Sequence, residues 1–91
     1  MDKERLKGKN VLITGAAQGM GAAIAEHYCA QGAKVCITDV NIDGCKEVEE
    51  RIRSAGGEAI SCKLDVRKRE DHVAAVKATV EAFGSLNVSL N

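Results

Sequence analysis

The sequence has no proline and no tryptophan, and it has no net charge, because 13 Lys and Arg residues balance 13 Asp and Glu residues. Without a basic excess there is no bulk electrostatic attraction to nucleic acid, so we expect no nucleic-acid partner. No apolar run approaches the roughly 18 residues that a membrane-spanning helix needs, so we expect no membrane partner. The charged first ten residues lack the apolar stretch of a secretory signal, which favours a cytoplasmic location.

The cysteines also lack a recognisable pattern. Cys29, Cys36, Cys45 and Cys62 are separated by 7, 9 and 17 positions, which matches no zinc-binding motif. We therefore predict free, buried thiols and no metal site. The two histidines are likewise expected to be structural or surface residues.

What the sequence does contain is a regular alternation of short β-branched runs and helical patterns. Strands are predicted at 10–14, 34–38, 58–64 and 86–91, and helices at 19–31, 41–55 and in the segment that ends at residue 83. The buried stripes are expected to be Cys45, Val48, Ile52 and Ala55 on the second helix, and Val73, Val76, Val80 and Phe83 on the third.

This order, βαβαβαβ, is typical of a parallel sheet with helical crossovers. A chain of 91 residues has room for one small domain at most. The predicted fold class is therefore α/β, as a partial doubly wound parallel sheet of the Rossmann type.

A glycine-rich turn joins the first predicted strand to the first helix. Its pattern, G-x-x-x-G-x-G, differs from both the usual dinucleotide fingerprint and the P-loop. A side chain at Gly15 or Gly19 would obstruct the turn or keep the backbone away from a ligand. The last glycine, Gly21, lets the helix pack close to the strand. Exposed N–H groups at the helix start would then bind a diphosphate. The candidate residues are Thr14, Gly15, Gln18, Gly19, Met20 and Gly21.

Asp39 stands at the end of the second predicted strand, 18 residues after Gly21. An acid at this place can accept two hydrogen bonds from a ribose diol, and its charge repels a 2′-phosphate. Glycine turns also occur without phosphate, and an Asp after a strand is often a helix cap. Because strand, turn, helix, second strand and acid all fall within residues 9–39, we favour dinucleotide binding. Neighbouring Gln18 and Val40 supply no cation, which favours NAD over NADP.

With these residues in place, the sequence resembles the short-chain dehydrogenase/reductase family. The resemblance covers essentially the whole chain and includes the turn, Asp39, the pair Asp65-Val66 and the segment 83–86. It implies that the Asp65 carboxylate and the Val66 backbone bind adenine, and that Asn91 is the first residue of a cofactor-binding motif. From the residues alone, Asp65 is more readily a cap for the third helix. Three positions depart from the family pattern: Met20, Arg67 and Ser89.

The resemblance further implies an oxidoreductase that transfers hydride between NAD and an alcohol or carbonyl substrate. The family's Ser and Tyr-x-x-x-Lys are missing, because the only tyrosine, Tyr28, has Gly32 four residues later and lies on an apolar helix face. We therefore assign no catalytic residue and predict that residues 1–91 are an N-terminal cofactor-binding portion, inactive alone and truncated before the catalytic segment. The alternative is a naturally short, non-catalytic nucleotide-binding or interaction module.

The family topology places the strands in the spatial order third, second, first, fourth. The fourth strand would then lie at an edge with apolar residues and no Lys or Pro to block pairing. A homo-oligomer is therefore expected.

Overall fold

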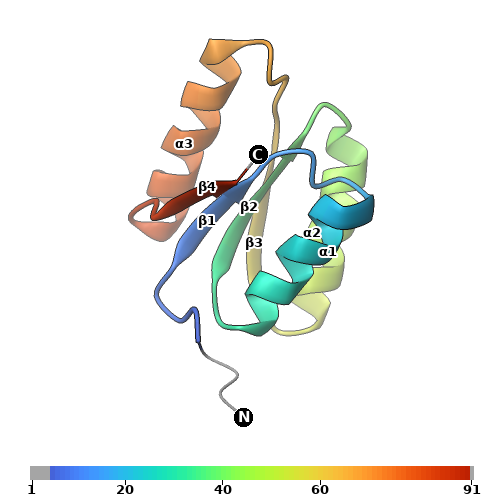
Figure 1. Ribbon diagram of the computed structural model, residues 1–91, viewed down its shortest axis with the longest axis vertical. Helices are drawn as coiled ribbons and strands as arrows, with labels where there is room; N and C mark the ends of the chain where they lie inside the picture. The colour runs from blue at the N-terminus through green and yellow to red at the C-terminus, as the bar shows by residue number, and fades with distance from the viewer. Residues whose placement is uncertain (1–4, 91) are drawn as a thin grey trace.

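The computed structural model describes residues 5–90 as a four-stranded parallel sheet with helices on both faces (Figure 1). Asn91, one of the predicted cofactor residues, lies outside the described residues. The elements are β1 (Asn10–Ile13), α1 (Gly19–Ala30), β2 (Lys34–Asp39), α2 (Ile42–Ser54), β3 (Glu58–Lys63), α3 (Arg69–Phe83) and β4 (Val88–Leu90). The order confirms the predicted fold class, and the spatial order β3-β2-β1-β4 confirms the expected topology.

The two central strands are buried on both faces of the sheet. All four residues of β1 are buried, as are the four inner residues of β2. Alternate side chains point to opposite faces, so Val11 and Val35 contact the core beneath α1 and α2, whereas Leu12 and Cys36 contact the core beneath α3. This explains why the sequence shows continuous apolar runs here rather than an alternating pattern.

Helices α1 and α2 cover one face together (Figure 1). Helix α2 buries Cys45, Val48 and Ile52, as predicted, and the Asn41 side chain caps it by accepting a hydrogen bond from the Gly44 N–H at 3.0 Å. The prediction for Ala55 was wrong. This residue is exposed because it follows the last helical turn, where the chain already leaves the sheet.

Helix α3 covers the other face with a stripe that matches the predicted one only in part. Its buried residues are Ala75 and Thr79, while Val73 and Val80 are 57% and 42% exposed. Small residues four positions apart let the helix lie close to the sheet, and the Thr79 hydroxyl is satisfied within the helix by the Ala75 carbonyl at 2.8 Å. Of the predicted stripe, Val76 packs against this core and Phe83 is half-buried, so the 3-4-3 spacing identified the helix correctly and was wrong for Val73 and Val80.

Strand β4 is shorter than predicted. Leu86 packs against the α3 core before the strand begins, and Asn87 fixes the approach by hydrogen bonding to Asn10 through its backbone N–H at 2.9 Å and its side-chain oxygen at 2.8 Å. Val88 is 40% exposed at this edge. The backbone of β4 still pairs with β1, so polar Ser89 is accommodated opposite Leu12 on an exposed edge strand.

The four cysteines are free thiols. Cys36 and Cys45 are buried as predicted, but Cys29 and Cys62 are only half-buried, and burial raises the pKa of Cys29 and Cys45 to about 11. The side-chain interaction of Cys62 on β3 with Cys36 on β2 lowers the pKa of Cys62. Within residues 5–90, no three metal-ligating side chains converge, and no helix is long and apolar enough to cross a membrane.

Candidate cofactor-binding site

The candidate site lies at the edge of the sheet that is formed by the carboxyl ends of three neighbouring parallel strands, β1, β2 and β3 (Figure 1). Asp39 is the last residue of β2 and pairs with Lys63, the last residue of β3. The Leu64 N–H continues this pairing by donating to the Asp39 carbonyl at 3.0 Å, so Asp65 follows directly. The turn after β1 is held to the same edge, because the Ala16 N–H donates to the Thr38 carbonyl at 3.0 Å.

The β1–α1 turn depends on glycine in two physical ways. Gly15 and Gly19 have φ values of +64° and +62°, in the left-handed region that favours glycine. Gly21 has ordinary helical φ but no room, because a Cβ there would lie 2.9 Å from the Gly15 carbonyl carbon, 3.0 Å from Ala16 Cα and closer still to the Gly15 oxygen. The expectation that Gly21 permits close packing is therefore right, but its contact is the turn itself rather than the strand.

The N-terminus of α1 is open to solvent and carries no anionic group of its own. Gln18 precedes the helix in an extended conformation and makes no side-chain capping hydrogen bond, and no acidic residue lies in the first turn. Gln18, Gly19 and Met20 are all exposed, Met20 by 80%. A helix start of this kind presents N–H donors and the positive end of the helix dipole to a ligand.

The Asp39 carboxylate spans from the turn to the start of α2. Its Oδ2 accepts a hydrogen bond from the Ala17 N–H at 3.2 Å, and its Oδ1 accepts one from the Asn41 N–H at 3.1 Å. Because Asn41 is the cap of α2, Asp39 is not. With respect to residues 5–90, each Asp39 oxygen keeps one further acceptor position.

The Asp65 carboxylate is held by Arg67 two residues later. Asp65 Oδ1 accepts from the Arg67 backbone N–H and from Nε, both at 3.0 Å, and Oδ2 accepts from Nη2 at 2.8 Å. These hydrogen bonds lower the pKa of Asp65 well below its usual range. The interpretation of Asp65 as a cap for α3 was wrong, since Lys68 precedes that helix and no side chain caps it.

The segment between β3 and α3 is closed by further hydrogen bonds to the Asp65 backbone. The Asp65 N–H donates to Asp71 Oδ2 at 3.0 Å, and the Lys68 N–H donates to the Asp65 carbonyl at 2.9 Å. Val66 between them is 73% exposed. The Asp65 side chain is only 15% exposed, although its partner Arg67 is 85% exposed. The segment therefore fixes the carboxylate while leaving its surroundings accessible.

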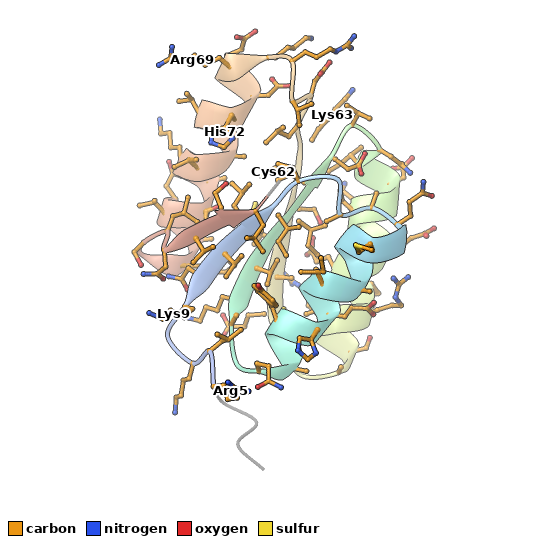
Figure 2. All side chains as sticks on the ribbon, viewed as in Figure 1. Arg5, Lys9, Cys62, Lys63, Arg69 and His72 are labelled. Carbon is orange, nitrogen blue, oxygen red and sulfur yellow. The ribbon has the colours of Figure 1, made fainter. Side chains whose placement is uncertain are left out.

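Thr14 connects this edge to β4 and to a groove on the α3 side. Its backbone N–H donates to the Leu90 carbonyl at 2.9 Å. Thr14 and Val66 line a groove of about 520 Å³ together with Leu64, Lys68, Arg69 and His72. Figure 2 shows Arg69 and His72 at the start of α3, at the same end of the molecule as Lys63.

The structure thus brings nine of the ten predicted cofactor residues to one edge of the sheet, and the tenth is Asn91. Sequence reasoning missed two contacts. One is the Ala17 N–H, whose only signal would have been its place inside the turn. The other is Arg67, which the sequence analysis noted only as a departure from the family pattern at an expected capping position. The available signal was the Asp-x-Arg spacing, because side chains two residues apart in a tight turn can form a hydrogen bond.

Taken together, the parallel β3-β2-β1-β4 sheet and the glycine-rich turn define a Rossmann-type α/β protein. The family model described as short chain dehydrogenase matches residues 9–91. The chain belongs to the short-chain dehydrogenase/reductase family.

Two curated relatives illustrate the similarity. The 2,5-dichloro-2,5-cyclohexadiene-1,4-diol dehydrogenase LinX of Sphingobium indicum is 47% identical over 87 residues, covering 96% of this chain and 35% of the relative. The 7alpha-hydroxysteroid dehydrogenase of Escherichia coli is 32% identical over 90 residues, covering 99% of this chain and 35% of the relative. The chain therefore spans about a third of the length of these relatives.

The fold agrees with solved structures of the family. The crystal structure of hydroxysteroid dehydrogenase from Escherichia coli superposes with a TM-score of 0.92 at 32% identity, covering 97% of this chain and 37% of that one. A short chain dehydrogenase from Mycobacterium smegmatis superposes with a TM-score of 0.91 at 34% identity, covering 97% of this chain and 38% of that one.

Proposed function

We propose that this chain binds the adenosine diphosphate part of NAD, as the cofactor-binding portion of an oxidoreductase acting on an alcohol or carbonyl substrate. The observation that carries the proposal is the uncapped start of α1 beside the Asp39 carboxylate. The first suits a diphosphate and the second suits a ribose diol, and the turn joins them through the 3.2 Å contact between the Ala17 N–H and Asp39.

The glycine-rich turn supports the fit of a diphosphate. Cβ atoms at Gly15 and Gly19 would meet nothing within 4 Å, so the space in front of both residues is open to a ligand. The Asp39 oxygens have two acceptor positions left after their contacts with Ala17 and Asn41, which matches the two hydroxyls of a ribose. A 2′-phosphate would bring its negative charge next to this carboxylate, and this favours NAD over NADP.

We further propose that adenine lies against Asp65 and Val66, next to the ribose site at the end of β2. The adjacency of the two strand ends, joined by the Leu64 N–H and the Asp39 carbonyl, supports this assignment.

When bound, the nicotinamide ring supplies the hydride chemistry. The chain's one tyrosine, Tyr28, packs against the core near the C-terminal end of α1, whereas the candidate site lies at the start of that helix. We therefore expect this chain alone to show no turnover.

The edge of β4 supports the proposal that the chain associates with itself. At the other edge, the Arg53 guanidinium covers the Ala59 carbonyl of β3 with two hydrogen bonds of 3.0 and 3.2 Å. At β4, Val88 is exposed and the strand contains no charged side chain. Light scattering over a concentration series tests this: dimers or soluble oligomers are expected, and a strictly monomeric species contradicts it.

Calorimetric titration of the whole chain with NAD, NADP, ADP and nicotinamide mononucleotide tests the cofactor proposal. We expect NAD to bind more tightly than NADP, ADP to compete with NAD, and nicotinamide mononucleotide to bind weakly or not at all. Absence of NAD and ADP binding at millimolar concentrations would overturn the proposal. Tighter binding of NADP than of NAD would overturn the assignment of Asp39 while leaving the diphosphate site standing.

A further inference from the structure

We infer that Arg67 is a positioning residue for adenine recognition, because it holds the Asp65 carboxylate with one acceptor position left for the amino group of the base. This inference rests on the proposed function, which places adenine beside Asp65. It assigns a role to Arg67, one of the three residues at which the sequence departs from the family pattern.

The first step is a count of acceptor positions. An ionised carboxylate has about four, two on each oxygen. On Asp65 Oδ1, the Arg67 backbone N–H and Nε take both, and on Oδ2 the Arg67 Nη2 takes one. One position on Oδ2 is therefore left in the described part of the chain, and adenine carries one amino group as a donor.

The second step is that the carboxylate cannot easily turn away from this orientation. Arg67 contacts it through a backbone N–H as well as through two guanidinium nitrogens, so the local turn itself sets part of the geometry. The backbone of Asp65 is also held on both sides, by Asp71 and by the Lys68 N–H. A carboxylate that is already fixed loses less conformational entropy when a ligand binds than a mobile carboxylate does.

The third step separates this role from that of an ordinary surface ion pair. Exposed pairs contribute little to stability, and Arg67 is 85% exposed. An ion pair with no positioning role would change the affinity for all nucleotides by the same factor, through its charge. A positioning residue instead affects the discrimination between bases, so the ratio of two affinities is the informative quantity.

The experiment is calorimetric titration of the whole chain with ADP and with inosine diphosphate, whose base has a carbonyl oxygen where adenine has the amino group. In the wild type we expect ADP to bind about 10- to 150-fold more tightly, the range for loss of a hydrogen bond to a charged group. Arg67→Ala should reduce this ratio by about 2- to 12-fold, the cost of ordering one released side chain.

Two further variants make the result specific. Arg51→Ala is the matched control, because Arg51 forms an exposed ion pair of 3.2 Å with Glu26 far from the site, and it should leave the ratio unchanged. Arg67→Lys keeps the charge but not the planar fork, so it should lower the ratio as Arg67→Ala does. It also keeps the test decisive if Arg67→Ala does not fold, as judged by circular dichroism.

The outcomes distinguish this inference from the proposed function. Equal affinities for both nucleotides in the wild type would show that Asp65 does not recognise the amino group, and would overturn the inference while the diphosphate site stands. A parallel loss of both affinities in Arg67→Ala that Arg67→Lys restores, or an unchanged ratio, would also overturn it, since charge alone would then explain Arg67. Failure of the wild type to bind either nucleotide would overturn the proposed function and the inference with it.

Discussion

The β1–α1 turn and the carboxylates after β2 and β3 lie at the same edge of the sheet, but they are built differently. The turn offers backbone N–H groups, positioned by the φ angles of Gly15 and Gly19 and by the close approach of Gly21. The other half offers oxygen atoms of Asp39 and Asp65, positioned by hydrogen bonds from neighbouring residues.

This difference has consequences for how each half tolerates change. A backbone site fails when the chain can no longer follow its path, so a single added carbon can abolish it. A side-chain site loses affinity one hydrogen bond at a time, and its effects should be graded. The hydrogen bond from the Ala17 N–H to the Asp39 carboxylate joins the two halves directly.

The largest effect is expected for Gly21→Ala. At an ordinary helical position this change stabilises a protein by about 1 kcal/mol. Here the new Cβ would collide with the backbone of Gly15 and Ala16, so we expect a loss of about 1–3 kcal/mol in the free energy of unfolding. That loss corresponds to roughly 4–24 °C in Tm for a chain of this size.

Thermal unfolding followed by circular dichroism measures the Gly21→Ala effect, and NAD titration should show that binding is lost because the turn must move. An unchanged or raised Tm with normal NAD affinity would show that the turn yields easily. In that case the backbone half would be no less tolerant than the side-chain half.

Gly19→Val should abolish NAD binding and cost only moderate stability. A β-branched residue at the Gly19 φ of +62° is strained by about 1–2 kcal/mol, and its methyl groups fill the open space in front of the turn. Gly84→Val is the matched control. Gly84 has a φ of +95° and equally open surroundings, but it lies at the C-terminal end of α3, away from the candidate site. Similar NAD affinity in both variants, measured by calorimetry, would remove Gly19 from the site.

The same distinction explains what the sequence could predict. Glycine spacing after a strand constrains the backbone strongly, so the path of the turn was predictable. The positions of Asp39 and Asp65 followed from the strand ends, but their partners did not, because the Ala17 N–H and the Arg67 fork depend on how the turns close in three dimensions. Valine spacing located α3, yet its buried face follows from how closely small residues approach the sheet.

Asp39→Asn tests the side-chain half with a smaller, graded effect. The amide keeps one oxygen acceptor, so either Ala17 or Asn41 loses a partner for its N–H, and the ribose loses a charged acceptor. We expect the preference for NAD over NADP to narrow by about 10- to 150-fold. Asp43→Asn, in the first turn of α2, removes the same charge beside the site and should leave the preference unchanged. Equal narrowing in both variants would attribute the preference to general charge rather than to Asp39.

The smallest effect concerns the dependence of stability on pH through Asp65. Arg67 lowers the pKa of this carboxyl in the folded state below the unfolded value of about 3.9. The pair therefore stabilises the fold above that pH, and its contribution is lost progressively as the pH falls through and below about 4, because the unfolded state then binds a proton that the folded state does not.

Arg67→Ala removes this contribution, so the difference in urea midpoint between wild type and variant should be small at pH 7 and should shrink as the pH is lowered toward 2.5. The difference for Arg51→Ala, which removes the exposed ion pair with Glu26 away from the site, serves as the comparison. A difference for Arg67→Ala that stays constant from pH 7 to 2.5 would mean that Arg67 stabilises the segment by packing alone, and that the Asp65 charge is not what it holds in place.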